Sequence, residues 1–329
     1  MFHFVGDLLS PAGDRGALAV LIYHRVLGAP DPILHDEIDR SIFEQHMQMM
    51  ASEFNVLPLG KACARLASGT LPSRALSVTF DDGYADNEQV ALPVLNRLGL
   101  QATFFISTGF AEGGLMFNDA IFEAVRAAPT GVHDLSRLGL GMIDLGAALS
   151  RRAAAERLID ALKYRPLVRR RELVEEVTAT LRSALPPRLM MTPAQIVHLH
   201  ESGMEIGAHT VNHPILTSLS DRDARAEIVT SKRMLEEMTG SPITLFAYPN
   251  GKPGQDYGLQ HVRLVKEAGF AAAVSTVLGI CHGRSDPFQL PRIGPWERDP
   301  RRLAARLLYM CACERARVPL RRCLRSRQA

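Results

Sequence analysis

The sequence lacks the features that mark secreted and membrane-spanning proteins. Its five cysteines are an odd number without the spacing of a disulfide framework or of paired zinc-binding CxxC units, and this usage fits a reducing compartment. No apolar run approaches the roughly 18 residues that a transmembrane helix needs. Residues 1–16 also lack the basic start and the apolar core of a signal peptide. We therefore expect a cytoplasmic protein, which could still lie at the inner membrane as a peripheral protein.

An excess of charge of either sign is also absent from the chain as a whole. The formal net charge is only +3 over 329 residues, which gives no indication of a nucleic-acid partner. The charge is uneven, however, because residues 298–329 hold ten arginines and two acids, a net charge of +8 against −5 for the remainder. We expect a mildly acidic body with a basic C-terminal tail, which could contact an anionic membrane surface or a glycosyltransferase partner.

The chain does contain a repeated alternation of short apolar strands and amphipathic helices. Apolar runs, several rich in β-branched and aromatic residues, predict seven strands, at 17–23, 75–80, 101–108, 204–209, 243–249, 271–276 and 288–294. Alternation with helices indicates parallel strands joined by right-handed crossovers. The pattern favours a closed or nearly closed β/α barrel over an open doubly wound sheet.

A segment rich in Ala, Arg and Leu interrupts this alternation. Its pattern predicts an inserted helical unit rather than further barrel repeats. We therefore divide the chain into an N-terminal extension, a barrel in two parts, a helical insertion and a basic tail, at 1–16, 17–112 with 192–297, 113–191 and 298–329. In barrels of this kind the chemistry lies at the C-terminal ends of the strands. The polar residues at those ends are therefore the candidate site.

The stretch TFDDGY (79–84) ends the second predicted strand with Asp81, Asp82 and Gly83. Neighbouring strand residues point to opposite faces, but a bend at Gly83 could turn both carboxylates to the barrel mouth. Two acids at an apolar strand end are costly unless they hold a cation or accept hydrogen bonds. A plainer alternative is that Asp82 or Asp86 caps the following helix.

The stretch HTVNH (209–213) places His209 and His213 four residues apart, just after another predicted strand. On one helical turn the two imidazoles would share a face and could bind one metal ion. This spacing is common by chance, so its weight comes from its position after a strand, like that of the Asp pair. One Asp and two His would leave an open position for water, as in catalytic metal sites.

Together these motifs resemble those of the polysaccharide deacetylases, the fourth family of carbohydrate esterases. TFDDG is similar to the family's first motif, and HTVNH to its H-[ST]-x-x-H motif. LFAYPNG (245–251) looks like the FAYP form found in relatives of the poly-N-acetylglucosamine deacetylases. The resemblance covers about 17–110 and 192–295. It implies an α/β fold, a deformed (β/α)7-type barrel, here with a helical insertion and a basic helical C-terminal tail.

The family resemblance also implies a role for each of these side chains. Asp82, His209 and His213 would bind a divalent metal ion, usually zinc in this family, and Asp81 would be the general base. The metal would polarise an acetamide carbonyl and lower the pKa of its water from 15.7 toward about 7, so that Asp81 can take the proton. The residues that could stabilise the oxyanion or contact substrate are Tyr84, Thr210, Tyr248 and Asn250.

The chain departs from the family pattern in three places. The third motif often carries an arginine that orients the base, and Ala247 stands there; the fourth often has an aromatic wall, which AAVSTVLG lacks. The fifth often supplies a histidine as general acid, but this chain has Arg292. We predict that Arg292 orients Asp81. We also predict that His24, at the end of the first strand, is the general acid, which requires that strand to lie beside the last; His282 is the alternative.

The predicted function is metal-dependent removal of N-acetyl groups from an amino-sugar polysaccharide or glycan intermediate, in exopolysaccharide or cell-envelope biosynthesis. Two alternatives stay open. One is an amidohydrolase or deformylase that acts on a small or lipid-linked sugar, and the other is a carbohydrate-binding module without activity. The complete set of Asp81, Asp82, His209 and His213 argues against the inactive module.

Overall fold

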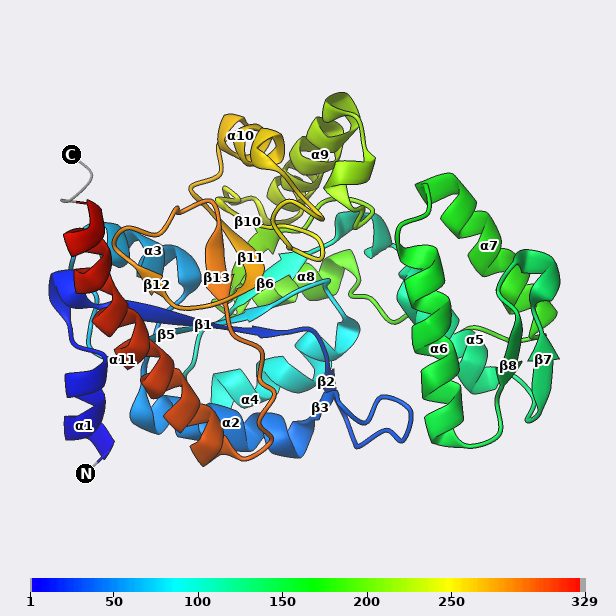
Figure 1. The fold of residues 1–329 in the computed structure, drawn as a ribbon, viewed down its shortest axis with the longest axis horizontal. Helices are drawn as coiled ribbons and strands as arrows, with labels where there is room; N and C mark the ends of the chain where they lie inside the picture. The colour runs from blue at the N-terminus through cyan, green and yellow to red at the C-terminus, as the bar shows by residue number, and fades with distance from the viewer. Residues whose placement is uncertain (1, 326–329) are drawn as a thin grey trace.

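Seven parallel strands form the barrel at the centre of the molecule (Figure 1). The computed structural model describes residues 2–325, with side chains for residues 5–314. Around the sheet the strands follow one another as β1 (Ala17–Tyr23), β5 (Ala75–Phe80), β6 (Thr103–Ile106), β9 (Glu205–Ala208), β10 (Leu245–Ala247), β11 (Ala272–Leu278) and β13 (Leu290–Arg292). All neighbours in this order are parallel, as the alternation of strands and helices predicts.

A hydrogen-bonded bridge joins the last of these strands back to the first. The Ile22 N–H donates to the Ile293 carbonyl (3.1 Å), and the Ile293 N–H donates to the Val20 carbonyl (2.8 Å). The bridge closes the sheet, which confirms that the first strand lies beside the last. The predicted deformed (β/α)7-type barrel is confirmed with it.

Four two-residue strands supplement the barrel: β2 (Val26–Leu27), β3 (Ile38–Asp39), β4 (Asn55–Val56) and β12 (Cys281–His282). β2 pairs with β3, and β4 extends the sheet beside β5. β12 runs antiparallel to the start of β1, where His282 faces Ala17. The sequence did not predict these strands, because two residues carry no periodicity.

Helices cover the outside of the barrel (Figure 1). They are α2 (Arg40–Glu53), α3 (Leu59–Ala67), α4 (Leu92–Arg97), α8 (Pro193–Glu201), α9 (Asp221–Thr239) and α10 (Leu259–Glu267). Single turns of other helix types lie at Gly13–Arg15, Asn87–Ala91, Thr108–Phe110, Ser136–Leu138 and Leu216–Ser218. The apolar side of α2, with Phe43, Met47 and Met50, is fully buried in the main core.

The insertion forms a separate lobe beside the barrel, drawn in green in Figure 1. It holds α5 (Phe117–Ala127), α6 (Ala148–Lys163) and α7 (Leu167–Thr180) around an apolar core of its own. It also contains an antiparallel hairpin of β7 (Val132–Asp134) and β8 (Met142–Asp144). The insertion was predicted to be helical, and the hairpin was missed because its strands have only three residues each.

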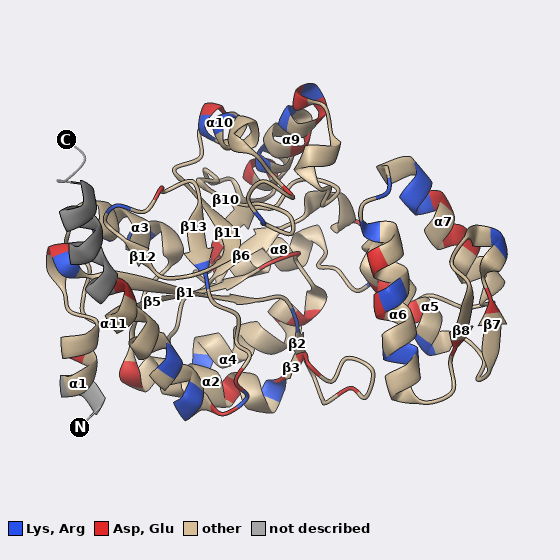
Figure 2. Cartoon of the chain, in the orientation of Figure 1, with Lys and Arg blue, Asp and Glu red and all other residues tan. Residues whose placement is uncertain are grey.

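Acids accompany the arginines of the insertion, and Figure 2 shows both signs of charge on α6 and α7. Arg152 pairs with Glu156 on the same helix, and Arg169 pairs with Glu172 and Glu176. Exposed pairs of this kind contribute little stability. Most of this surface is therefore a solvated face of mixed charge rather than a basic patch.

A helix near each end of the chain packs against the barrel: α1 (Phe2–Leu9) and α11 (Pro300–Arg325). Leu303, Leu307 and Cys311 of α11 are at most 1% exposed and belong to the main core. The predicted division at residue 298 is therefore wrong for the first part of the tail, whose apolar stripe is needed by the barrel. Six of the ten arginines lie beyond residue 314, so the expected membrane or glycosyltransferase contact concerns side chains outside those described. Among residues 2–325, no helix is long and apolar enough to cross a membrane.

Candidate active site

The two adjacent carboxylates lie in a sharp bend where β5 ends. Asp82 has a φ of 76° and Gly83 a φ of 91°, in the left-handed region that non-glycine residues rarely adopt. A Cβ on Gly83 would stand 3.1 Å from Cγ2 of Ile106, so glycine also meets a space requirement there. The Asp81 N–H donates to the Tyr23 carbonyl (2.9 Å), which ties this bend to the end of β1. The bend that Gly83 was expected to allow is present, although Asp82 carries part of the strain.

His209 and His213 are brought together by an irregular turn and not by the helical turn that their spacing suggested. Thr210 and His213 have φ values of 66° and 50°, and the Thr210 hydroxyl accepts the His213 N–H (3.1 Å). The Glu227 carboxylate, from α9, accepts the N–H groups of Val211 and Asn212, each at 2.8 Å. The two rings end with centroids 4.8 Å apart.

Asp82, His209 and His213 form a cluster that suits a metal ion. Oδ1 of Asp82 lies 3.4 Å from Nε2 of each histidine, and the three candidate ligand atoms lie within 4.8 Å of one another. That oxygen is buried without a hydrogen-bond partner among the described residues, as expected of an atom that binds a cation. Nδ1 of His209 is 2.7 Å from the Ala247 carbonyl, which leaves Nε2 for the metal. One carboxylate and two imidazoles are the donor types that zinc accepts.

The surroundings favour an ionised Asp82 and a neutral His213. Burial acts to raise the pKa of Asp82, but the nearby imidazoles of His213 and His209 hold that pKa well below its usual value. Burial lowers the pKa of His213 to about 4. Burial acts to lower the pKa of His209, but the neighbouring carboxylates of Asp82 and Asp81 raise that pKa above its usual value. An ionised carboxylate and a neutral imidazole are the forms that bind metals.

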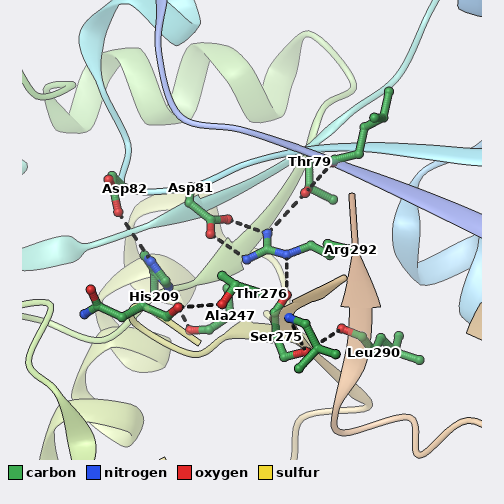
Figure 3. A network of polar contacts seen from close by, with 12 residues as sticks. Thr79, Asp81, Asp82, His209, Ala247, Ser275, Thr276, Leu290 and Arg292 are labelled. Carbon is green, nitrogen blue, oxygen red and sulfur yellow. Dashed lines mark hydrogen bonds and ion pairs between the residues drawn. The ribbon is translucent and has the colours of Figure 1, made fainter. Parts of the chain in front are cut away.

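Asp81 is held by Arg292 through two parallel hydrogen bonds (Figure 3). Nη1 and Nη2 of Arg292 lie 2.7 and 2.6 Å from the two carboxylate oxygens. The guanidinium is fixed in turn by the Ser275 carbonyl (2.9 Å) and the Thr79 hydroxyl (3.2 Å). Burial acts to raise the pKa of Asp81, but the charge of Arg292 keeps that pKa below its usual value. A buried guanidinium thus contacts Asp81, although Ala247 stands where the family often has the arginine.

His24 lies at the barrel mouth, directly after β1. Its side chain is exposed, and its carbonyl accepts a hydrogen bond from the Asn87 amide (2.8 Å). Its charge is close enough to contribute to lowering the pKa of both Asp81 and Asp82. The alternative acid, His282, faces Ala17 at the other end of β1, which at about 3.3 Å per residue is roughly 20 Å away. His282 therefore cannot serve this site.

The four predicted substrate contacts lie around the site, but two of them have structural tasks. Tyr248 is fully buried, its hydroxyl donates to the Phe288 carbonyl and its N–H to the Val274 carbonyl, so it is a core residue and not a substrate contact. Thr210 is also fully buried, and its hydroxyl orders the His213 turn. Tyr84 directly follows the Asp82–Gly83 bend, and Asn250, half-buried with a φ of 58°, lies three residues beyond the end of β10.

A buried carboxylate of the insertion joins the site and was missed by the sequence reasoning. Asp119, on α5, accepts the Tyr84 hydroxyl at 3.1 Å, and its other oxygen is buried without a partner among the described residues. The Arg25 guanidinium lies 4.9 Å from the centre of the Tyr84 ring and pairs with Asp86 at 2.8 Å. Asp119 is one of several acids in the insertion, and its sequence context gave no signal that it would lie beside Tyr84.

Asp119→Asn is expected to change how the free energy of unfolding depends on pH. Burial, with a smaller contribution from Asp82, raises the pKa of Asp119 from 3.8 to about 7 against the opposing charge of Arg25. Its contribution to stability is thus fully present below about pH 4 and is lost as pH rises toward 7, by up to about 1.4 kcal/mol per pH unit. Urea unfolding of both proteins between pH 5 and pH 8, with a chelator present, measures this slope. Parallel stability curves would show that Asp119 does not titrate this way.

Comparison with known proteins agrees with this geometry. The family model described as polysaccharide deacetylase matches residues 68–273, more than half of the chain. The candidate polysaccharide deacetylase YxkH of Bacillus subtilis is 20% identical over 278 residues, which are 84% of this chain and 70% of YxkH.

Two solved structures share the fold over nearly their whole length. The Streptococcus pyogenes deacetylase PplD, in complex with acetate, is 20% identical with a TM-score of 0.60, over 90% of this chain and 98% of its own. IcaB from Ammonifex degensii is 19% identical with a TM-score of 0.57, again over 90% of this chain and 98% of its own.

Proposed function

The chain belongs to the polysaccharide deacetylase family, and from this premise we propose that it is a metal-dependent hydrolase acting on N-acetylated amino sugars. Its substrate is a polysaccharide or a glycan intermediate of exopolysaccharide or cell-envelope synthesis. One observation carries the proposal. The cluster of Asp82, His209 and His213 lies beside the buried Asp81–Arg292 pair at one end of a closed barrel.

The metal-binding cluster and the Asp81 carboxylate beside it have different roles in the reaction. A zinc ion held by Asp82, His209 and His213 would polarise the amide carbonyl and acidify a water molecule. Asp81 takes the proton of the attacking water, because it is ionised and each of its oxygens keeps a lone pair beyond the one that Arg292 uses. Arg292 is the positioning residue that fixes the direction of this carboxylate.

Residues that follow β1 and β5 act on the developing oxyanion and on the leaving nitrogen of the amide. The backbone N–H of Tyr84 is a candidate donor to the developing oxyanion. Asp119 holds the Tyr84 side chain in place by accepting the hydrogen bond of its phenol hydroxyl. His24 donates a proton to the leaving amine nitrogen as the C–N bond breaks. The products are acetate and the free amino sugar. Release of acetate from an N-acetylated amino-sugar oligomer is the direct test.

His209→Ala is expected to remove most of the bound divalent metal, because it deletes one of three protein ligands. Elemental analysis of the purified proteins measures the loss, and zinc should be the metal found in the parent chain. His198→Ala is the matched control, since His198 is an exposed histidine that pairs with Glu88 on the barrel surface. If His209→Ala retains the metal content of the parent, the assignment of the ligands is wrong.

A further inference from the structure

A pocket of about 470 Å³ lies between the metal-binding turn and the insertion. Asn212 and His213 line one part of it, so the pocket opens on the catalytic cluster. Apolar side chains from the insertion form most of the rest, among them Leu115, Phe117, Leu167, Val168 and Val174. Four charged residues complete the lining, Arg170, Arg171, Glu172 and Glu175, of which Glu172 pairs with Arg169. A volume of this size is typical of small-molecule sites. The reaction itself uses none of the insertion side chains in this wall.

A buried cation lies in the wall of the pocket. Arg170 is only 7% exposed, and its guanidinium lies 4.2 Å from the centre of the Phe117 ring. One of its nitrogens donates to the Lys163 carbonyl (3.2 Å), and no carboxylate of the described residues pairs with it. Burial lowers the pKa of Arg170 without a counter-charge to offset it. A buried cation without a counter-ion is costly, which indicates that its anion comes from a ligand.

The position of Arg170 in its helix strengthens this indication. Arg169 and Arg170 lie in the first turn of α7, and Arg171 directly follows it; at this end of the helix the dipole is positive and acids are favoured. That turn contains no acid, and its N-cap, Pro166, makes no side-chain cap. Arg170 and Arg171 both line the pocket. The guanidinium groups of Arg170 and Arg171, near the positive end of a helix, suit a phosphate.

We propose that the insertion adds a second substrate subsite, which binds a phosphate-linked hydrocarbon chain carried by the amino sugar. The inference rests on the proposed function, because His213 places the reacting sugar at one end of the pocket. The phosphate lies at Arg170, and the chain lies along Leu167 and Val168 of α7. Val168 is 73% exposed, so the chain can leave the pocket there.

The wall also distinguishes a hydrocarbon from a nucleoside as the group beyond the phosphate. A nucleotide base binds best on an open aromatic face, and Arg170 already covers a face of Phe117. The exposed apolar side chains of the α7 wall are aliphatic. A flexible alkyl chain therefore fits this surface better than a planar base does.

Four synthetic derivatives of N-acetylglucosamine test the subsite on the full-length, zinc-loaded protein: the methyl glycoside, the octyl glycoside, the 1-phosphate and the octyl phosphodiester. We expect kcat/KM for acetate release to be highest for the phosphodiester, by about 10-fold or more over the others. Arg170→Met should remove this preference mainly through KM. Arg169→Gln is the control, since Arg169 is exposed and pairs with Glu172 and Glu176. Val168→Glu, on the exposed wall of the pocket, should weaken binding of the octyl phosphodiester without changing the buried core of the insertion.

Binding measurements separate failure of the subsite from failure of the proposed function. Calorimetry with the octyl phosphodiester should show binding that Arg170→Met weakens by about 10-fold or more, even if no acetate is released. Equal rates for all four compounds would overturn the subsite and leave the deacetylase function in place. Absence of binding would also overturn it. A UDP-linked N-acetylglucosamine that binds more tightly through Arg170 than the octyl compound would show that the occupant is a nucleotide and not a hydrocarbon.

Discussion

Asp81→Asn is expected to lower turnover of an N-acetylated amino-sugar oligomer at least ~10²-fold, the low end of what a general base contributes. An amide cannot take the proton of the attacking water at neutral pH. Asp81 is 2% exposed and is not one of the three candidate metal ligands, so the metal content should be largely preserved. Acetate release and elemental analysis on the same preparation give the two readouts.

The Asp81–Arg292 pair requires a control for folding. Removing one partner of a buried ion pair leaves the other uncompensated, which typically costs about 3–5 kcal/mol of stability. Circular dichroism and thermal unfolding must therefore accompany the kinetics. If Asp81→Asn fails to fold, the double variant with Arg292→Gln removes the unpaired cation as well. Near-normal acetate release from either folded variant would exclude Asp81 as the base.

Those features of the site that depend on the ends of barrel strands could be predicted from the sequence. Parallel strands bring their carboxyl ends to one side, so Asp81, Asp82 and His209 had to meet once the barrel was recognised. The contact between Asp81 and Arg292 follows from the same reasoning. Residue 292 ends β13, and β13 closes against β1 beside β5.

The features that failed depend on contacts between distant segments or on backbone strain. His213 was predicted as a ligand and lies in the cluster, but the expected helical turn is wrong. It is replaced by a turn with positive φ values that Glu227 holds from α9, which no local pattern encodes. Asp119 comes from the insertion, whose placement against the barrel the sequence does not state. The tail was separated from the barrel because its arginines outweighed the apolar stripe that contains Leu303 and Leu307.

His24→Ala is expected to lower turnover by a factor of about 10²–10⁴ while the metal content stays that of the parent. His24 follows β1 at the mouth, its side chain is exposed, and it is not part of the metal-binding cluster. Its task is to protonate the leaving nitrogen, so the loss should shrink for substrates whose amines leave easily. A series of N-acetylated amines of decreasing basicity measures this dependence.

His282→Ala provides the matched control for this loss. It removes a histidine on β12, beside the opposite end of β1 and next to Glu314, where no proton transfer to substrate is feasible. Its turnover should equal that of the parent across the whole series of amines. If His24→Ala lowers turnover by the same factor for good and poor leaving groups, His24 assists binding and another group protonates the amine. Equal kinetics for both variants would remove His24 from the mechanism, because a surface histidine changes stability by less than about 0.5 kcal/mol and has no effect on the chemical step.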